Sequence, residues 1–166
     1  MQIPSDEQVG DRLRAAVAAE LPAERGLEAW RALLEAHATL VRRLETDLEL
    51  STGLALADFD VLAQLALAGG RLRMSELADR ALISRSGMTR RVARLVDEGL
   101  VRRESAQADA RGIVVALTPE GEARLMETAP IHARGIGELF VARLSDDELE
   151  ALEQTLGKLR VDCSFG

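Results

Sequence analysis

The chain has 166 residues, 30% of them charged, with a formal net charge of −7 at pH 7 and one cysteine. A single cysteine excludes an intramolecular disulfide, and neither a Cys-x2-Cys motif nor a histidine pair predicts a metal site. With 2% aromatic residues, the core must be built from Ala, Leu, Val and Met, which favours a mostly helical protein. The length suits one compact domain, or a smaller domain whose helices need a partner.

Two helices are expected in the N-terminal third. Residues 5–20 carry apolar side chains on one side, and Pro22 and Gly26 interrupt that pattern. A long helix follows over residues 27–50, where apolar residues recur every three or four positions. Its end is predicted at Gly53, because glycine is the usual residue just past a helix terminus.

The next segment reads as helix, strand and helix. Residues 57–68 are predicted to be helical and stop at Gly69-Gly70. Residues 71–74 alternate briefly, which suits a short strand. Ser75 is the predicted N-cap of a helix over residues 76–80, because its hydroxyl can accept a free backbone N–H.

Residues 84–99 form an amphipathic helix with a basic outer side. The apolar residues at one side are Met88, Val92, Leu95 and Val96. The opposite side carries Ser86, Arg90 and Arg94, with Gly87 beside them and Arg91 flanking. Arginine can bond bidentately to guanine edges or bind phosphates, and Ser and Thr can bond to either.

A two-stranded wing is predicted directly after this helix. Residues 100–104 suit one strand, and residues 113–117 alternate as a second. The polar turn between them carries Arg111 near its tip. A guanidinium at that position suits a narrow minor groove.

The C-terminal part predicts two further helices. Thr118-Pro119-Glu120 has the capping hydroxyl, the proline and the acid of a helix start. Pro130 is expected to kink or divide that helix before it continues to about Leu144. Ser145 and Glu148 form a capping box for the last helix.

The central segment resembles the MarR (multiple antibiotic resistance regulator) family of bacterial transcription factors. The wing pattern Asp-x-Arg-x5-Leu-Thr is met by Asp109, Arg111, Leu117 and Thr118. The helix pattern of the family is met by Ser84, Thr89, Arg90, Val92, Leu95, Gly99, Leu100, Val101 and Arg103. The similarity extends over residues 27–159 and is sharpest over residues 70–120.

This resemblance implies a winged helix-turn-helix flanked by N- and C-terminal dimerisation helices. Residues 1–54 would be N-terminal dimerisation helices, residues 55–118 the DNA-binding region and residues 119–166 the C-terminal dimerisation helices, in one intertwined domain per protomer. The homodimer would bind a pseudo-palindromic operator with half-sites about one helical turn apart. Repression released by a small molecule or stress is the expected mode. The alternative is a winged-helix protein–protein interaction module without specific DNA binding.

Charge distribution agrees with DNA binding despite the acidic total. Residues 71–111 hold ten arginines and six acids, a net of +4, which leaves −11 for the rest of the chain. The predicted major-groove residues are Ser86, Gly87, Thr89, Arg90 and Arg94. Arg85 and Arg91 are assigned to phosphates and Arg111 to the minor groove, while Asp109 is expected to fix the wing. Of Arg102 and Arg103, one would reach phosphate and the other pair with Glu98 or Asp97.

The resemblance also implies an effector pocket for a small aromatic or anionic compound. Its predicted residues are Trp30, Leu34, His37, Phe59, Asp60 and His132. The alternative is that both histidines are ordinary packing residues. Cys163 is interpreted as an incidental thiol, the alternative being a redox sensor. No cofactor, catalytic residue, signal peptide or membrane span is predicted, and a cytoplasmic location is expected, on the nucleoid when DNA is bound.

Overall fold

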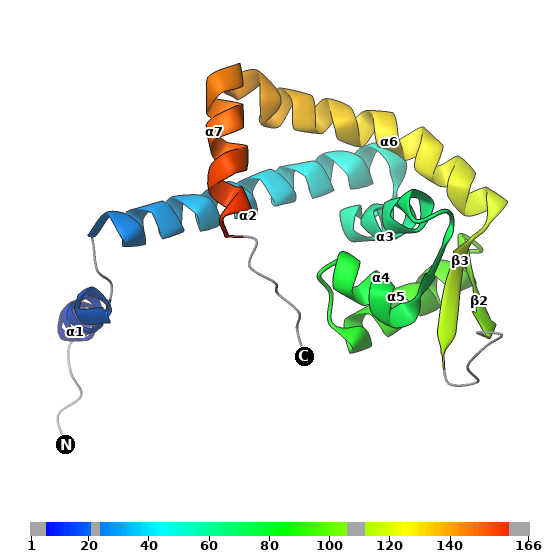
Figure 1. Cartoon of the computed structure of the whole chain (residues 1–166), viewed down its shortest axis with the longest axis horizontal. Coiled ribbons are helices and arrows are strands. Elements are labelled where there is room, and N and C mark those ends of the chain that lie inside the picture. Colours follow the sequence, from blue (N-terminus) through cyan, green and yellow to red (C-terminus); the bar gives the residue numbers. More distant parts are fainter. Residues whose placement is uncertain (1–5, 21–23, 106–111, 160–166) are drawn as a thin grey trace. The chain divides into compact units, whose positions relative to one another are not determined.

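The computed structural model describes residues 6–20, 24–105 and 112–159 (Figure 1). The helices are α1 (Asp6–Glu20), α2 (Glu24–Thr52), α3 (Leu56–Leu67), α4 (Met74–Arg80), α5 (Arg85–Asp97), α6 (Pro119–Leu139) and α7 (Asp146–Gly157). The strands are β1 (Arg71–Arg73), β2 (Val101–Ser105) and β3 (Ile113–Leu117), and a 3-10 turn, η1, covers Val141–Arg143. The predicted class, mostly helical with a small β wing, is confirmed.

Contacts along the chain define two compact units, residues 1–42 and 43–166. The first contains α1 and the N-terminal part of α2. Its apolar side chains are widely exposed, for example Leu13 at 64% and Trp30 at 56%. The second contains the remaining elements. The predicted division into dimerisation and DNA-binding parts stays a prediction.

The sheet has three antiparallel strands in the order β1-β3-β2. Leu72 of β1 and Arg103 of β2 both pair with Val115 on the central strand. Val115 is fully buried, as expected of a branched side chain on the face of a central strand. The short strand predicted over residues 71–74 is therefore present, and it lies beside the wing.

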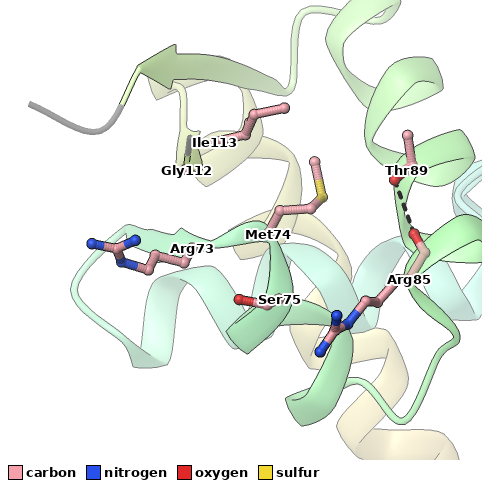
Figure 2. Close-up of a pocket in the computed structure, with 7 residues that line it drawn as sticks. All are labelled: Arg73, Met74, Ser75, Arg85, Thr89, Gly112 and Ile113. Atoms are coloured by element: carbon pink, nitrogen blue, oxygen red, sulfur yellow. Dashed lines mark hydrogen bonds between the residues drawn. The ribbon is translucent and has the colours of Figure 1, made fainter. Parts of the chain in front are cut away.

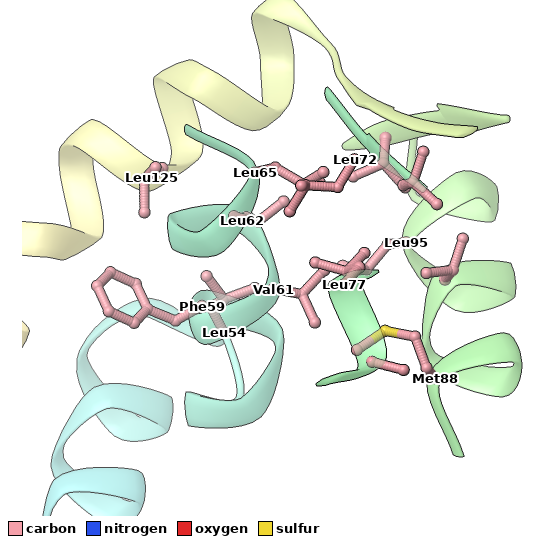
Figure 3. Packing of buried hydrophobic residues seen from close by; sticks show 14 of the residues in the cluster. Leu54, Phe59, Val61, Leu62, Leu65, Leu72, Leu77, Met88, Leu95 and Leu125 are labelled. Carbon is pink, nitrogen blue, oxygen red and sulfur yellow. The ribbon is translucent and has the colours of Figure 1, made fainter. Parts of the chain in front are cut away.

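The core of the second unit lies among α3, α4, α5 and the sheet (Figure 3). Val61, Leu62 and Leu65 of α3 are fully buried, and Leu77 of α4 and Leu95 of α5 close the cluster. Leu125 extends it to α6. Burying each such side chain contributes about 1.5–3 kcal/mol, so this cluster fixes where α5 and the wing lie.

Two predicted helix starts are confirmed, one predicted N-cap is wrong, and the predicted division of the helix at Pro130 is absent. Thr118 and Ser145 cap α6 and α7 with their hydroxyls. Ser75 is not an N-cap, because α4 begins at Met74 and the Glu76 carboxylate accepts the Arg73 backbone N–H at 3.0 Å. Pro130 does not divide α6, which runs through it and ends at Leu139.

Thr118 also joins the base of the wing to α6. Its hydroxyl lies 2.8 Å from the Gly99 carbonyl oxygen and 2.9 Å from that of Leu100, to which it can donate. The same oxygen accepts the Gly121 N–H at 3.0 Å. The N-terminus of α6 is thereby held against the turn that follows α5.

Over the described residues, no single helix has both the length and the apolar character to cross a membrane. Residues 25–52 and α3 taken together have that length and apolar character, but a bend of 86° lies between the two helical segments.

Candidate nucleic-acid interface

The helix α5 begins at a capped turn. The Ser84 hydroxyl accepts the backbone N–H of Gly87 at 3.2 Å, which satisfies one of the free donors at the helix start. Gly87 lies close to its surroundings, since a β carbon there would stand 2.9 Å from the Ile83 side chain. The turn that leads in contains Leu82 at φ 53°, a left-handed conformation.

The buried and exposed sides of α5 follow the predicted pattern. Met88, Val92 and Leu95 are fully buried. Ser86, Arg90 and Arg94 are exposed and follow one another at four-residue spacing, so they form a single row along the helix. The Arg90 side chain makes no hydrogen bond or ion pair with any residue in the described part of the chain, so its guanidinium is available to a ligand.

A cleft opens beside this row, between α5, α4 and the start of β3 (Figure 2). Its volume is about 310 Å³, and its lining residues are Arg73, Met74, Ser75, Arg85, Thr89, Gly112 and Ile113. The Thr89 hydroxyl donates to the Arg85 carbonyl oxygen at 2.9 Å. Of the lining residues, Arg73 and Arg85 carry positive charge, and sequence reasoning had not included Arg73.

Arg91 and Arg94 both contact Asp58 of α3. The Arg91 Nη1 donates to Asp58 Oδ1 at 2.7 Å, and the Arg94 Nη2 donates to the other carboxylate oxygen. The Asp58 side chain is only 4% exposed, against 26% for Arg91 and 52% for Arg94. The predicted contacts of these arginines with DNA stay predictions, but their guanidinium groups already have a partner.

The arginines of the wing strands pair within the sheet and with α5. Arg102 Nε donates to Glu104 Oε1 at 2.8 Å, and Arg71 bonds to the other oxygen of that carboxylate. Arg103 Nη2 donates to the Thr89 carbonyl oxygen at 3.3 Å. The expected pairing of Arg102 or Arg103 with Glu98 or Asp97 was wrong, because these arginines bond to Glu104 and Thr89 while Glu98 lies 3.8 Å from Arg94 Nε. Arg111 and Asp109 lie outside the described residues.

The predicted effector residues fall in both units. In the second unit, the Phe59 and His132 rings pack at 4.7 Å between centroids, tilted by 52°. Burial lowers the pKa of His132, and the charge of Asp60 opposes this. His132 Nδ1 is buried without a hydrogen-bond partner among the described residues. Trp30, Leu34 and His37 lie on α2 in the first unit, where all three are exposed.

The helices α3 and α4, the exposed basic helix α5 and the β2–β3 hairpin together define a winged-helix protein. The MarR family profile matches residues 52–112. A MarR family transcriptional regulator of Streptomyces coelicolor, Sco3205, solved in complex with DNA, is 33% identical with a TM-score of 0.78. That match covers 84% of this chain and 91% of Sco3205. The chain therefore belongs to the MarR family.

Two curated relatives match over shorter stretches. The transcriptional regulator HosA of Escherichia coli is 37% identical over 83 residues, which is 50% of this chain and 61% of HosA. The transcriptional repressor YetL of Bacillus subtilis is 33% identical over 108 residues, 64% of each protein. The chain thus spans less than two thirds of the length of these relatives.

Proposed function

We propose that this chain is a sequence-specific DNA-binding transcriptional regulator that acts as a homodimer. The observation that carries the proposal is the row on α5, where Ser86 and the unpaired Arg90 lie exposed beside the positive cleft. A helix enters the major groove with such side chains outward, while its apolar side packs on the protein. The relationship to Sco3205, which was solved with DNA, supports this proposal.

The proposed contacts with DNA are of three kinds, to base edges in the major groove, to phosphates and to the minor groove. Ser86, Thr89 and Arg90 would face base edges, with Gly87 allowing close approach and Arg94 at the end of the row. Arg85, in the cleft, would bind phosphate, whereas the Arg91 guanidinium predicted for the same role is bonded to Asp58. Arg111 would enter the minor groove from the wing, with Asp109 fixing the wing turn.

A second copy of the chain is the proposed partner of the exposed apolar side chains at both ends. Exposed examples are Val9, Leu13, Trp30, Ile136, Val141 and Leu159. Large apolar side chains left in water are costly, and a C2 dimer would cover them while placing two α5 helices on successive major grooves. Sedimentation equilibrium should give twice the 18.0 kDa chain mass, and a monomer at micromolar concentration would contradict the dimer.

Repression by occupying a pseudo-palindromic operator is the proposed outcome, and the name of YetL supports it. A small aromatic or anionic compound is the proposed effector. Its predicted contacts are Phe59, Asp60 and His132 in the second unit and, considered separately, Trp30, Leu34 and His37 on α2 in the first. The unpartnered His132 Nδ1 gives such a ligand a polar contact. With benzoate as the probe, His37→Ala should keep DNA binding and lose the response, whereas an unchanged response would remove His37 from the pocket.

The test of the function is a fluorescence-anisotropy titration against DNA from the chain's own promoter region, at several salt concentrations. Tight binding that weakens steeply with salt and exceeds binding to a scrambled duplex is expected. Weak and equal binding to both duplexes would contradict the proposal and favour the protein-interaction alternative.

A further inference from the structure

Asp58 is a buried acidic side chain of α3 that bonds to two arginines of α5. It is 3% exposed, in the first turn of that helix, next to the core residues Phe59 and Val61. A buried carboxylate is stable only when it is paired. Its two oxygens are bonded to two different arginines of α5, so it is a bridge between the helices.

Arg94 lies on the exposed side of α5, but its guanidinium group is bonded to Asp58 of α3. It continues the exposed row of Ser86 and Arg90, one turn further along α5. Its Nη2 nevertheless bonds to Asp58. Arg91, on the flank of the same row, is held by the other oxygen of that carboxylate.

These bonds reduce the number of α5 guanidinium groups that are available to DNA phosphates. Four arginines lie on α5. The buried carboxylate of Asp58 bonds to Arg91 and Arg94, so it offsets one of their two positive charges and holds both guanidinium groups in place. Arg85 and Arg90 have no such partner in the described part of the chain. Phosphate contacts add affinity without sequence information, so withholding two of them favours contacts that read bases.

We propose that Asp58 is a positioning residue for specificity: it withholds the guanidinium groups of Arg91 and Arg94 from DNA phosphates and so limits sequence-independent binding. The proposal rests on the proposed DNA binding. It predicts that removing the Asp58 charge strengthens binding to any duplex and lowers the preference for the operator.

The experiment compares Asp58→Asn with Asp97→Asn, an equal change of charge at an exposed position on α5 itself. Both are titrated against operator and scrambled duplexes over a salt series. Each guanidinium released to a phosphate should steepen the slope of log affinity against log salt by about 0.9. We expect that steepening, and a several-fold loss of preference for the operator, in Asp58→Asn only. Equal slopes in the two variants, or weaker binding to the scrambled duplex by Asp58→Asn, would overturn the inference.

A second set of variants shows whether Asp58 acts through the two arginines. In an Arg91→Gln/Arg94→Gln background, Asp58→Asn should leave the slope unchanged. If Asp58→Asn does not fold by circular dichroism, Arg94→Gln decides instead. Its slope on scrambled DNA should equal that of the wild type, whereas Arg85→Gln, which removes the proposed phosphate contact, should lower it. A slope reduced by about 0.9 in Arg94→Gln would show a phosphate contact already made and would overturn the inference.

The two failures can be distinguished by the wild type alone. If it has no preference for the operator, the proposed function fails. If it prefers the operator but Asp58→Asn behaves like Asp97→Asn, only the role of Asp58 fails.

Discussion

Gly121 and Leu100 meet so closely that a β carbon on Gly121 would stand 2.0 Å from the Leu100 carbonyl oxygen. Gly121 is buried in the first turn of α6, and Leu100 precedes the first wing strand. The contact brings α6 against the turn after α5, where Thr118 bonds to the same carbonyl. The glycine is required there for the close approach of two backbones.

Gly121→Ala should therefore destabilise the fold. The added methyl group must push α6 away from the wing, at a cost of about 3 kcal/mol or more. Gly137→Ala in the same helix is the matched control, because nothing lies within 4 Å of its β-carbon position. That control should be neutral or stabilising by roughly 0.5–1 kcal/mol. Urea denaturation measures both, and equal stabilities for the two variants would contradict the close approach.

A glycine at position 82 should have the opposite effect on stability from the alanine at position 121. Leu82 has φ 53° and is 79% exposed, so it bears left-handed strain and buries little. Leu82→Gly should raise the free energy of unfolding by about 1 kcal/mol, because glycine adopts this conformation without the clash. The control is Leu50→Gly, equally exposed at 83% but within α2. It should lower stability by about 1 kcal/mol, and a loss at both positions would refute the strain at Leu82.

His132 predicts a pH dependence of stability. Burial lowers its pKa below 6.5, so the unfolded chain binds a proton more readily than the folded one. The contribution is fully present above pH 6.5 and is lost as the pH falls through the lower pKa of the folded state. His132→Gln should flatten the stability curve between pH 7.5 and 5.5 in thermal melts. A wild-type slope retained by this variant would assign the pH dependence to other groups.

The local features of the fold were predictable because neighbouring residues determine them. The apolar side of α5 and the Thr118-Pro119 start of α6 both depend on residues within four positions of one another. The alternating pattern likewise predicted the wing strands. These signals placed Arg90 on the exposed side before its surroundings were known.

The features that were missed depend on residues far apart in the chain. Asp58 lies 33 and 36 residues from its two arginines, so periodicity on α5 alone could not show the bridge. The available sequence signal for a buried ion pair was Asp58 itself, an acidic residue among the apolar residues that precede Val61. Ser75 was wrongly predicted as the N-cap because the Glu76 carboxylate accepts the backbone N–H of Arg73, two residues earlier. Pro130 removes one backbone donor, which α6 accommodates at an exposed position.

The central claim is that α5 reads sequence through Arg90, and its most direct test is a set of base-substituted operators. The operator is first selected from random duplexes, and wild type and Arg90→Ala are then titrated against each single substitution by anisotropy. Arg90→Ala is expected to lose about 1–3 kcal/mol of binding free energy on the operator and to stop discriminating at one base step, while the other steps keep their preferences. A uniform loss over all duplexes, or no loss, would contradict base reading by this residue.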